Sequence, residues 1–89
     1  MNNETKHYSL YGTNVICAYP GIVSFRRDGK RYSIYEEKIN IDGRAPSIAF
    51  LPVDIMEFIV DLYDKTKWEE LKIAAEECQK FLAHKRGKK

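Results

Sequence analysis

At 89 residues, with 44% hydrophobic and 31% charged side chains, the chain fits one small globular domain, residues 1–89, rather than a disordered protein. Fifteen lysines and arginines against thirteen acidic residues leave a net charge of only +2, so total charge alone would not draw the protein to nucleic acid. No apolar run approaches 18 residues and the first residues, MNNETKHYS, lack an apolar core, so we expect a cytoplasmic protein without a membrane segment or signal peptide.

The first part of the chain predicts two β-strands. Residues 8–11 form a short edge strand, followed by a break at residues 12–14. Residues 15–19, VICAY, are apolar at successive positions, as expected of a strand covered on both faces or buried in a dimer. Pro20 and Gly21 then fit positions i+1 and i+2 of a type II turn, which leaves the register with the next strand open.

Residues 22–35, IVSFRRDGKRYSIY, give the strongest local signal. Asp28-Gly29 between two β-prone runs predicts a two-residue hairpin loop, because a type I′ turn needs positive φ at both positions. With this loop, Arg26 faces Arg31 and Arg27 faces Lys30. The predicted core face carries Val23, Phe25, Tyr32 and Ile34. The opposite face carries Ile22, Ser24, Arg26, Arg31, Ser33 and Tyr35.

The apolar residues change phase after this hairpin. Tyr32 and Ile34 have even numbers, whereas Ile39 and Ile41 have odd numbers. A strand of period two cannot change phase without an extra residue, so we expect a β-bulge or a break near residues 36–38.

The turn that contains Asp42-Gly43 has two interpretations. A two-residue loop sets Ile41 opposite Arg44, whereas a four-residue loop over residues 42–45 sets Ile39 opposite Ile48. The second suits the apolar pattern better. It predicts a last strand over residues 47–51, SIAFL, which Pro46 would open at the sheet edge.

The C-terminal part predicts helices. Asp54 is the expected N-cap, with Glu57 three residues later in a capping box. The apolar residues that follow have helical spacing: Ile55, Phe58, Ile59 and Leu62. Thr66 and Glu69 form a second capping box, which predicts a second helix; one helix bent at residues 65–67 is the alternative.

The second helix carries a heptad-like stripe. Its members are Trp68, Leu71, Ala75, Cys78 and Leu82. The stripe fits a helix packed on the sheet, or a dimer or partner interface anchored by Trp68.

Together these elements predict an α+β fold: an antiparallel β-meander of four to five strands, about residues 8–51, with one or two C-terminal helices, about residues 54–85, packed on one face. A basic tail, residues 84–89, follows. A four-strand meander and a helix over about residues 15–62 resemble the Whirly family of single-strand-binding proteins. The resemblance is one of element order and carries over no functional residue.

The sequence offers no pattern for metal binding or catalysis. His7 and His84 lie at opposite ends of the chain, and neither cysteine belongs to a CxxC pair. Cys17 and Cys78 are expected as buried free thiols rather than a disulfide. We therefore expect no metal, no cofactor and no enzymatic activity.

One candidate site remains, on the outer face of the hairpin. Arginines beside serine hydroxyls suit phosphate groups, and a nearby tyrosine suits stacking on a base. The predicted nucleic-acid or anion site comprises Arg26, Arg31, Arg27, Lys30, Tyr35 and Arg44. The alternative is an exposed hairpin whose long side chains extend into solvent or pair with Glu36 and Glu37.

Two functional hypotheses follow. The first is a small non-enzymatic module that binds nucleic acid through the hairpin face and the basic tail. The second is a protein-interaction, inhibitor or accessory module, in which the helix stripe or the arginine face docks an acidic protein partner. A homodimer is a further expectation, because a chain this small carries an additional apolar stripe.

Overall fold

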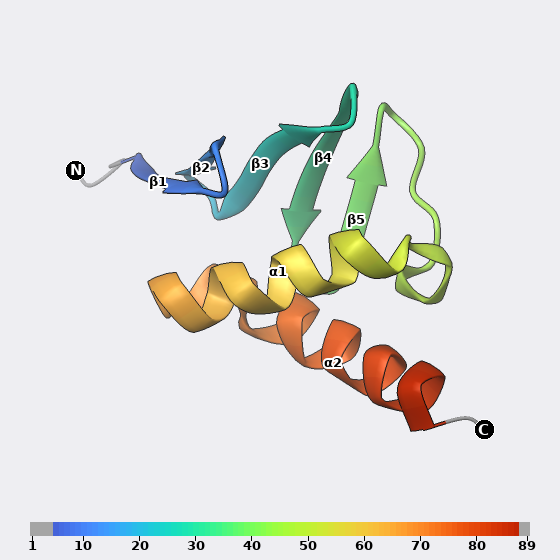
Figure 1. Cartoon of the computed structure of the whole chain (residues 1–89). Coiled ribbons are helices and arrows are strands. Elements are labelled where there is room, and N and C mark those ends of the chain that lie inside the picture. The colour runs from blue at the N-terminus through green and yellow to red at the C-terminus, as the bar shows by residue number, and fades with distance from the viewer. Residues whose placement is uncertain (1–4, 88–89) are drawn as a thin grey trace.

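Five strands form one antiparallel sheet in chain order, and two helices follow and pack on one of its faces (Figure 1). The computed structural model describes residues 5–87. The strands are β1 (Lys6–Leu10), β2 (Thr13–Ala18), β3 (Ile22–Arg27), β4 (Lys30–Tyr35) and β5 (Lys38–Ile41). The helical elements are the 3₁₀ turn η1 (Ile48–Phe50), α1 (Val53–Thr66), the 3₁₀ turn η2 (Glu69–Leu71) and α2 (Lys72–Gly87). The expected α+β meander with C-terminal helices is confirmed.

The β3–β4 hairpin has the predicted register. Asp28 and Gly29 form its loop with φ of 55° and 76°, and Arg26 lies opposite Arg31. The predicted core residues of the hairpin are each at most 3% exposed: Val23, Phe25, Tyr32 and Ile34. Local turn chemistry is therefore sufficient to orient this hairpin on the core.

The phase change after β4 comes from a second tight hairpin, not from a bulge. Tyr35 pairs with Lys38 across the two-residue loop Glu36-Glu37, in which Glu36 has φ of 57°. Partners across a two-residue loop have numbers of opposite parity, so the apolar face passes from Ile34 to Ile39. The break expected near residues 36–38 is thus the boundary between β4 and β5.

The predicted strand over residues 47–51 is wrong. Asp42-Gly43 is a two-residue loop, which brings Ile41 opposite Arg44 in an isolated bridge. The ladder ends there. The next residue of this segment whose backbone N–H would have to donate to β5 is Pro46, which has no N–H. Ser47 then accepts a hydrogen bond from the backbone N–H of Ala49 at 3.3 Å and begins η1. The sheet therefore ends at this bridge rather than at residue 51.

Two turns in the first half also differ from the prediction. Tyr11 and Gly12 form the β1–β2 loop, so β2 begins at residue 13. The backbone N–H of Gly21 donates to the carbonyl of Ala18 at 2.7 Å across a cis Tyr19–Pro20 bond. Pro20 therefore occupies position i+2, and the predicted type II turn is wrong.

Helix α1 begins one residue before the predicted N-cap. Pro52 is the N-cap and has no capping hydrogen bond, while Asp54 lies in the first turn, where its charge suits the helix dipole. The residues predicted for its apolar face are all buried: Ile55, Phe58, Ile59 and Leu62.

The chain forms two helices, and Thr66 ends the first of them. Its hydroxyl donates to the carbonyl of Leu62 at 2.8 Å and accepts from the backbone N–H of Trp68 at 3.2 Å. Lys67 follows in the left-handed conformation, with φ of 56°. The predicted Thr66–Glu69 capping box is therefore wrong. Helix α2 includes part of the predicted basic tail, and Lys88 and Lys89 lie outside the described residues.

The core fills the space between the inner face of the sheet and the helices (Figure 1). Phe58 of α1 packs against the sheet, with its ring centroid 4.8 Å from that of Phe25; Phe25 in turn stacks on Tyr32 at 5.2 Å. Among residues 5–87, no helix combines the length and apolarity needed to cross a membrane.

Candidate binding site on the open face of the sheet

The helices leave one face of the sheet uncovered by any described residue. Successive strand residues point to opposite faces, and the register of the four hairpins assigns each side chain to one of them. The uncovered surface, here called the open face, carries His7, Ser9, Asn14, Ile16, Ala18, Ile22, Ser24, Arg26, Arg31, Ser33, Tyr35, Lys38 and Asn40. None of these strand positions holds an acidic residue, whereas three hold lysine or arginine.

Arg26 and Arg31 lie side by side on the open face. The backbone N–H of Arg31 donates to Asp42 Oδ1 at 2.9 Å, and its carbonyl accepts from the Asp42 N–H at 2.9 Å. The backbone of Arg31 therefore hydrogen-bonds toward β5, and its pair with Arg26 is of the non-hydrogen-bonded kind, with Cα atoms about 4.5 Å apart. This is the closer of the two antiparallel pairings, so the two cationic side chains share a small area.

The charges of this arginine pair are not neutralised by the protein. Both residues are exposed, and the ion pairs among residues 5–87 include neither of them. The expected alternative partners, Glu36 and Glu37, form no salt bridge with them either. Like charges directly opposite each other on a sheet are destabilising, so an anion bound between them would relieve a cost of folding.

A hollow of about 470 Å³ adjoins the arginine pair. It forms because β2 pairs with β3 only from Ile16 to Ala18, so the start of β2 separates from the end of β3. The hollow is lined by Gly12, Thr13, Asn14, Ile16, Ser24, Phe25, Arg26, Arg31 and Ser33. Two guanidinium groups, an amide and hydroxyl groups thus border one concave surface, a set of groups that suits phosphate oxygens.

Tyr35 lies on the same face but at its other end. It is 43% exposed, and Ile22 beside it is 37% exposed. Tyr35 is four residues along β4 from Arg31, which corresponds to about 13 Å at the rise of an extended strand. Only an extended ligand would reach both the arginine pair and the tyrosine.

The structure separates the other predicted site residues from this pair. Arg27 belongs to the helix side: it donates to Thr13 Oγ1 at 2.8 Å, and its guanidinium carbon lies 4.5 Å from the ring centroid of Phe58. Lys30 is exposed and lies opposite Arg27, and Arg44 pairs with Ile41. Because residues directly opposite each other share a face, Lys30 and Arg44 both belong to the helix side of the sheet. Of the six predicted residues, Arg26, Arg31 and Tyr35 share the open face.

Sequence reasoning missed the members of the open face that lie outside the β3–β4 hairpin: His7, Ser9, Asn14, Ile16, Ala18, Lys38 and Asn40. The placement of Asn14 and Ile16 beside the arginine pair follows from the β2–β3 register, which could not be predicted from the turn at Pro20. Lys38 depends on the second hairpin, whose signal was the change of parity between Ile34 and Ile39.

The predicted helix stripe lies mainly in the core. Its four members within η2 and α2 are each at most 5% exposed: Leu71, Ala75, Cys78 and Leu82. Trp68 is partly buried, with its ring edge-on to Tyr8 at 6.5 Å and Lys6 Nζ 5.3 Å from its centroid. The stripe is buried by other residues of the same chain, so it does not support a dimer.

Both cysteines are free and buried, with Cys17 2% exposed. Burial raises the pKa of Cys78 to about 12, so its thiol is protonated at neutral pH. Residues 5–87 contain no group of three or more histidine, cysteine, aspartate or glutamate side chains that could hold a metal ion.

Comparison with known proteins does not assign the chain to a family. No family model, no curated protein and no solved structure matches it.

Proposed function

We propose that this protein is a small non-enzymatic module that binds nucleic acid on the open face. Arg26 and Arg31 hold phosphate groups, the hollow beside them accommodates the sugar-phosphate backbone, and Tyr35 stacks on a base. Phosphate contacts of this kind supply most of the affinity in sequence-independent binding, and an exposed aromatic ring accepts any base.

The observation that supports the proposal most is the unneutralised arginine pair. Two exposed guanidinium groups lie directly opposite each other, without an ion pair among residues 5–87 and on a face whose strand positions hold no acidic residue. Such an arrangement costs stability in the free protein, and a polyanion would offset that cost.

A second candidate ligand is an acidic segment of a protein. Carboxylates also pair with arginine, and Ile16 and Ile22 expose 39% and 37% of their surface on the same face. A peptide with acidic and apolar residues would use both features, whereas a nucleic acid would mainly use the arginines and Tyr35.

Fluorescence anisotropy with labelled single-stranded and duplex oligonucleotides tests the proposal. Measured between about 50 and about 200 mM salt, the affinity should fall with salt, and Arg26→Gln combined with Arg31→Gln should weaken it. Removing two phosphate contacts should flatten the slope of log K against log salt by about 1.4 for single strands and about 1.8 for duplexes.

The matched control is Lys65→Gln combined with Lys72→Gln, which removes the same charge from exposed positions on the helices. This control should leave affinity and salt slope nearly unchanged. The proposal is wrong if no oligonucleotide binds at low salt, or if the two double variants lose affinity equally. Competition by oligo-glutamate but not by oligonucleotides would favour the acidic protein ligand instead.

A further inference from the structure

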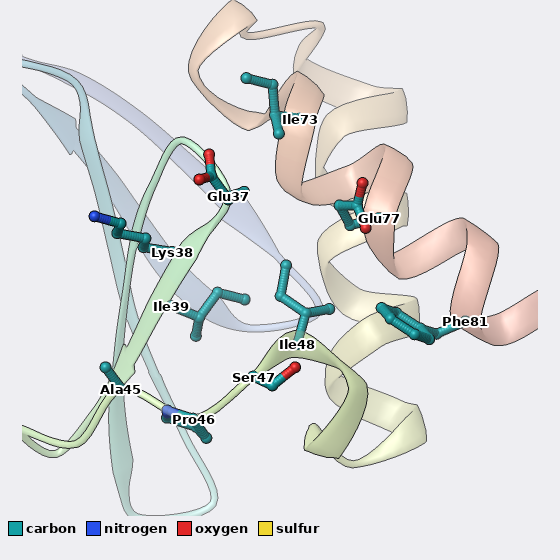
Figure 2. A pocket seen from close by; sticks show the side chains of 10 residues that line it. All are labelled: Glu37, Lys38, Ile39, Ala45, Pro46, Ser47, Ile48, Ile73, Glu77 and Phe81. Carbon is teal, nitrogen blue, oxygen red and sulfur yellow. The ribbon is translucent and has the colours of Figure 1, made fainter.

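A second concave surface lies on the helix side of the molecule, between β5 and α2 (Figure 2). It has a volume of about 780 Å³. One wall is the row Ile73, Glu77 and Phe81, spaced four residues apart and therefore aligned along one side of α2. The other wall comes from β5 and the segment before α1, where Ile39 and Ile48 face the helix (Figure 2).

The groove is lined by apolar residues, and its exposed apolar surface lies on the α2 side. Ile39 and Ile48 are 1% and 7% exposed, and Phe81 packs partly against the core. Ile73, at the rim, still exposes 45% of its surface. An apolar side chain seated between α2 and η1 would remove this surface from water, which is favourable in proportion to the area covered.

Two of the three charged residues that line the groove are acidic. Glu37 and Glu77 both line the groove. Lys38 lines it with its stem, but its register places it on the open face, and Figure 2 shows its amino group pointing away from Ile73 and Phe81. Lys80 donates to Glu77 at 3.3 Å in an exposed pair, a kind of contact that stabilises little and yields readily to a competing cation.

We propose that this groove binds a short extended segment of a partner protein, in which a bulky apolar side chain is flanked by lysine or arginine. The row from Ile73 to Phe81 spans eight residues of helix, about 12 Å, which matches about four residues of an extended peptide. The rim carboxylates select basic flanks. The helix layer around them has a slight excess of the same sign, since residues 53–87 contain eight acidic residues against six basic ones.

This site is independent of the nucleic-acid proposal. It lies on the other side of the sheet, and it takes a ligand of the opposite charge. A protein with both sites would hold a polyanion on the open face and a basic segment of a protein in the groove.

A phage library of random peptides, selected against the immobilised full chain, tests the inference. Enriched peptides should carry a bulky apolar residue beside lysine or arginine. Labelled synthetic copies of the enriched peptides are then titrated against variants by anisotropy. Ile73→Ser should weaken binding about tenfold, because its exposed apolar surface is lost, and Glu77→Lys should weaken it about fivefold.

Glu76→Lys is the matched control, because it makes the same charge change at a neighbouring exposed position that does not line the groove. Circular dichroism of each variant verifies that the fold is kept. The inference is overturned if no peptide is enriched, if the enriched peptides are acidic, or if Glu76→Lys and Glu77→Lys have equal effects. It is also overturned if sedimentation shows a dimer that Ile73→Ser dissociates, since a second copy would then occupy the groove.

Discussion

Replacing Arg26 with glutamine should make the folded protein more stable while it weakens the proposed ligand binding. Arg26 and Arg31 are directly opposed, both are exposed, and the salt bridges of residues 5–87 include neither. Glutamine keeps a polar side chain with hydrogen-bond donors but has no charge. The substitution therefore removes a repulsion that exists mainly in the folded chain.

The size of the effect follows from the pairing geometry. The separation of the two charges lies between about 4.5 Å, the Cα distance of such a pair, and about 10 Å, if the stems diverge into water. Over that range two unit charges repel by about 0.9 to about 0.4 kcal/mol in a water-like dielectric. For a domain of this size the gain corresponds to a rise in Tm of about 2–7 °C.

Thermal unfolding followed by circular dichroism measures this gain at low and at high salt. The gain should shrink in about 1 M salt, where the screening length is about 3 Å. Adding Arg31→Gln should bring little further gain, because the first substitution already removes the repulsion. Lys38→Gln is the control, since it removes a cation of the same face that lies opposite Tyr35 rather than another cation. A lower Tm for Arg26→Gln, or a gain that salt does not change, would refute the reasoning.

Three further predictions concern the core and its edge. Lys6 Nζ donates to Glu70 Oε1 at 2.9 Å and lowers the pKa of Glu70, so this contact stabilises the fold above the ordinary carboxyl pKa and is lost as pH falls through the folded value. Thermal melts should therefore show Glu70→Gln less stable than the wild type near pH 7, with a difference that shrinks as pH falls below the ordinary carboxyl pKa, and a constant difference would contradict this. Phe58→Ala should cost about 3–5 kcal/mol in urea unfolding, because its ring is 3% exposed and lies against Phe25; a cost below about 1 kcal/mol would show that the site collapses. The Cys78 thiol, with its pKa raised to about 12 by burial, should react with a disulfide reagent only in denaturant, and rapid reaction of the native protein would contradict its placement.

The parts of the fold that the sequence predicts well are those specified by short-range chemistry. Asp28-Gly29 sets both the loop and the register of β3 and β4, so the position of Arg26 opposite Arg31 could be predicted without any tertiary information. The apolar face of α1 is equally local, because the spacing of its buried residues is helical.

Residues 47–51 show where local patterns compete. Their alternating apolar residues fit a strand, but Pro46 has no N–H for the ladder and the Ser47 hydroxyl stabilises a 3₁₀ turn. A turn with its own hydrogen bonds needs no neighbouring strand, so the local alternative is the one that forms. The alternation of Ile48 and Phe50 could not reveal this, since Ile48 is buried in either conformation while Phe50 is 80% exposed here.

The candidate site was predictable only in part, for a related reason. The arginine pair belongs to one hairpin, whereas the hollow beside it depends on where β2 separates from β3. The heptad-like stripe likewise specifies that a helix face is buried, but spacing cannot tell a cover within the chain from one on another chain. In this structure the cover is intramolecular for Leu71 and Cys78 alike.

The separation of charge between the two layers decides from which side a polyanion would approach. Residues 5–51, which form the sheet and its turns, contain seven basic residues against four acidic ones, whereas the helices, residues 53–87, contain six against eight. The shortest dimension of the molecule is 24 Å, about three screening lengths at physiological salt, so the acidic residues of the helices barely reduce the potential at the open face. In about 0.01 M salt the screening length rises to about 30 Å, and the acidic residues of the helices would then lower the positive potential at the open face. The proposed affinity should therefore rise less steeply at very low salt than the two arginines alone predict, and a log–log plot that stays linear down to that range would mean that the helices do not oppose binding.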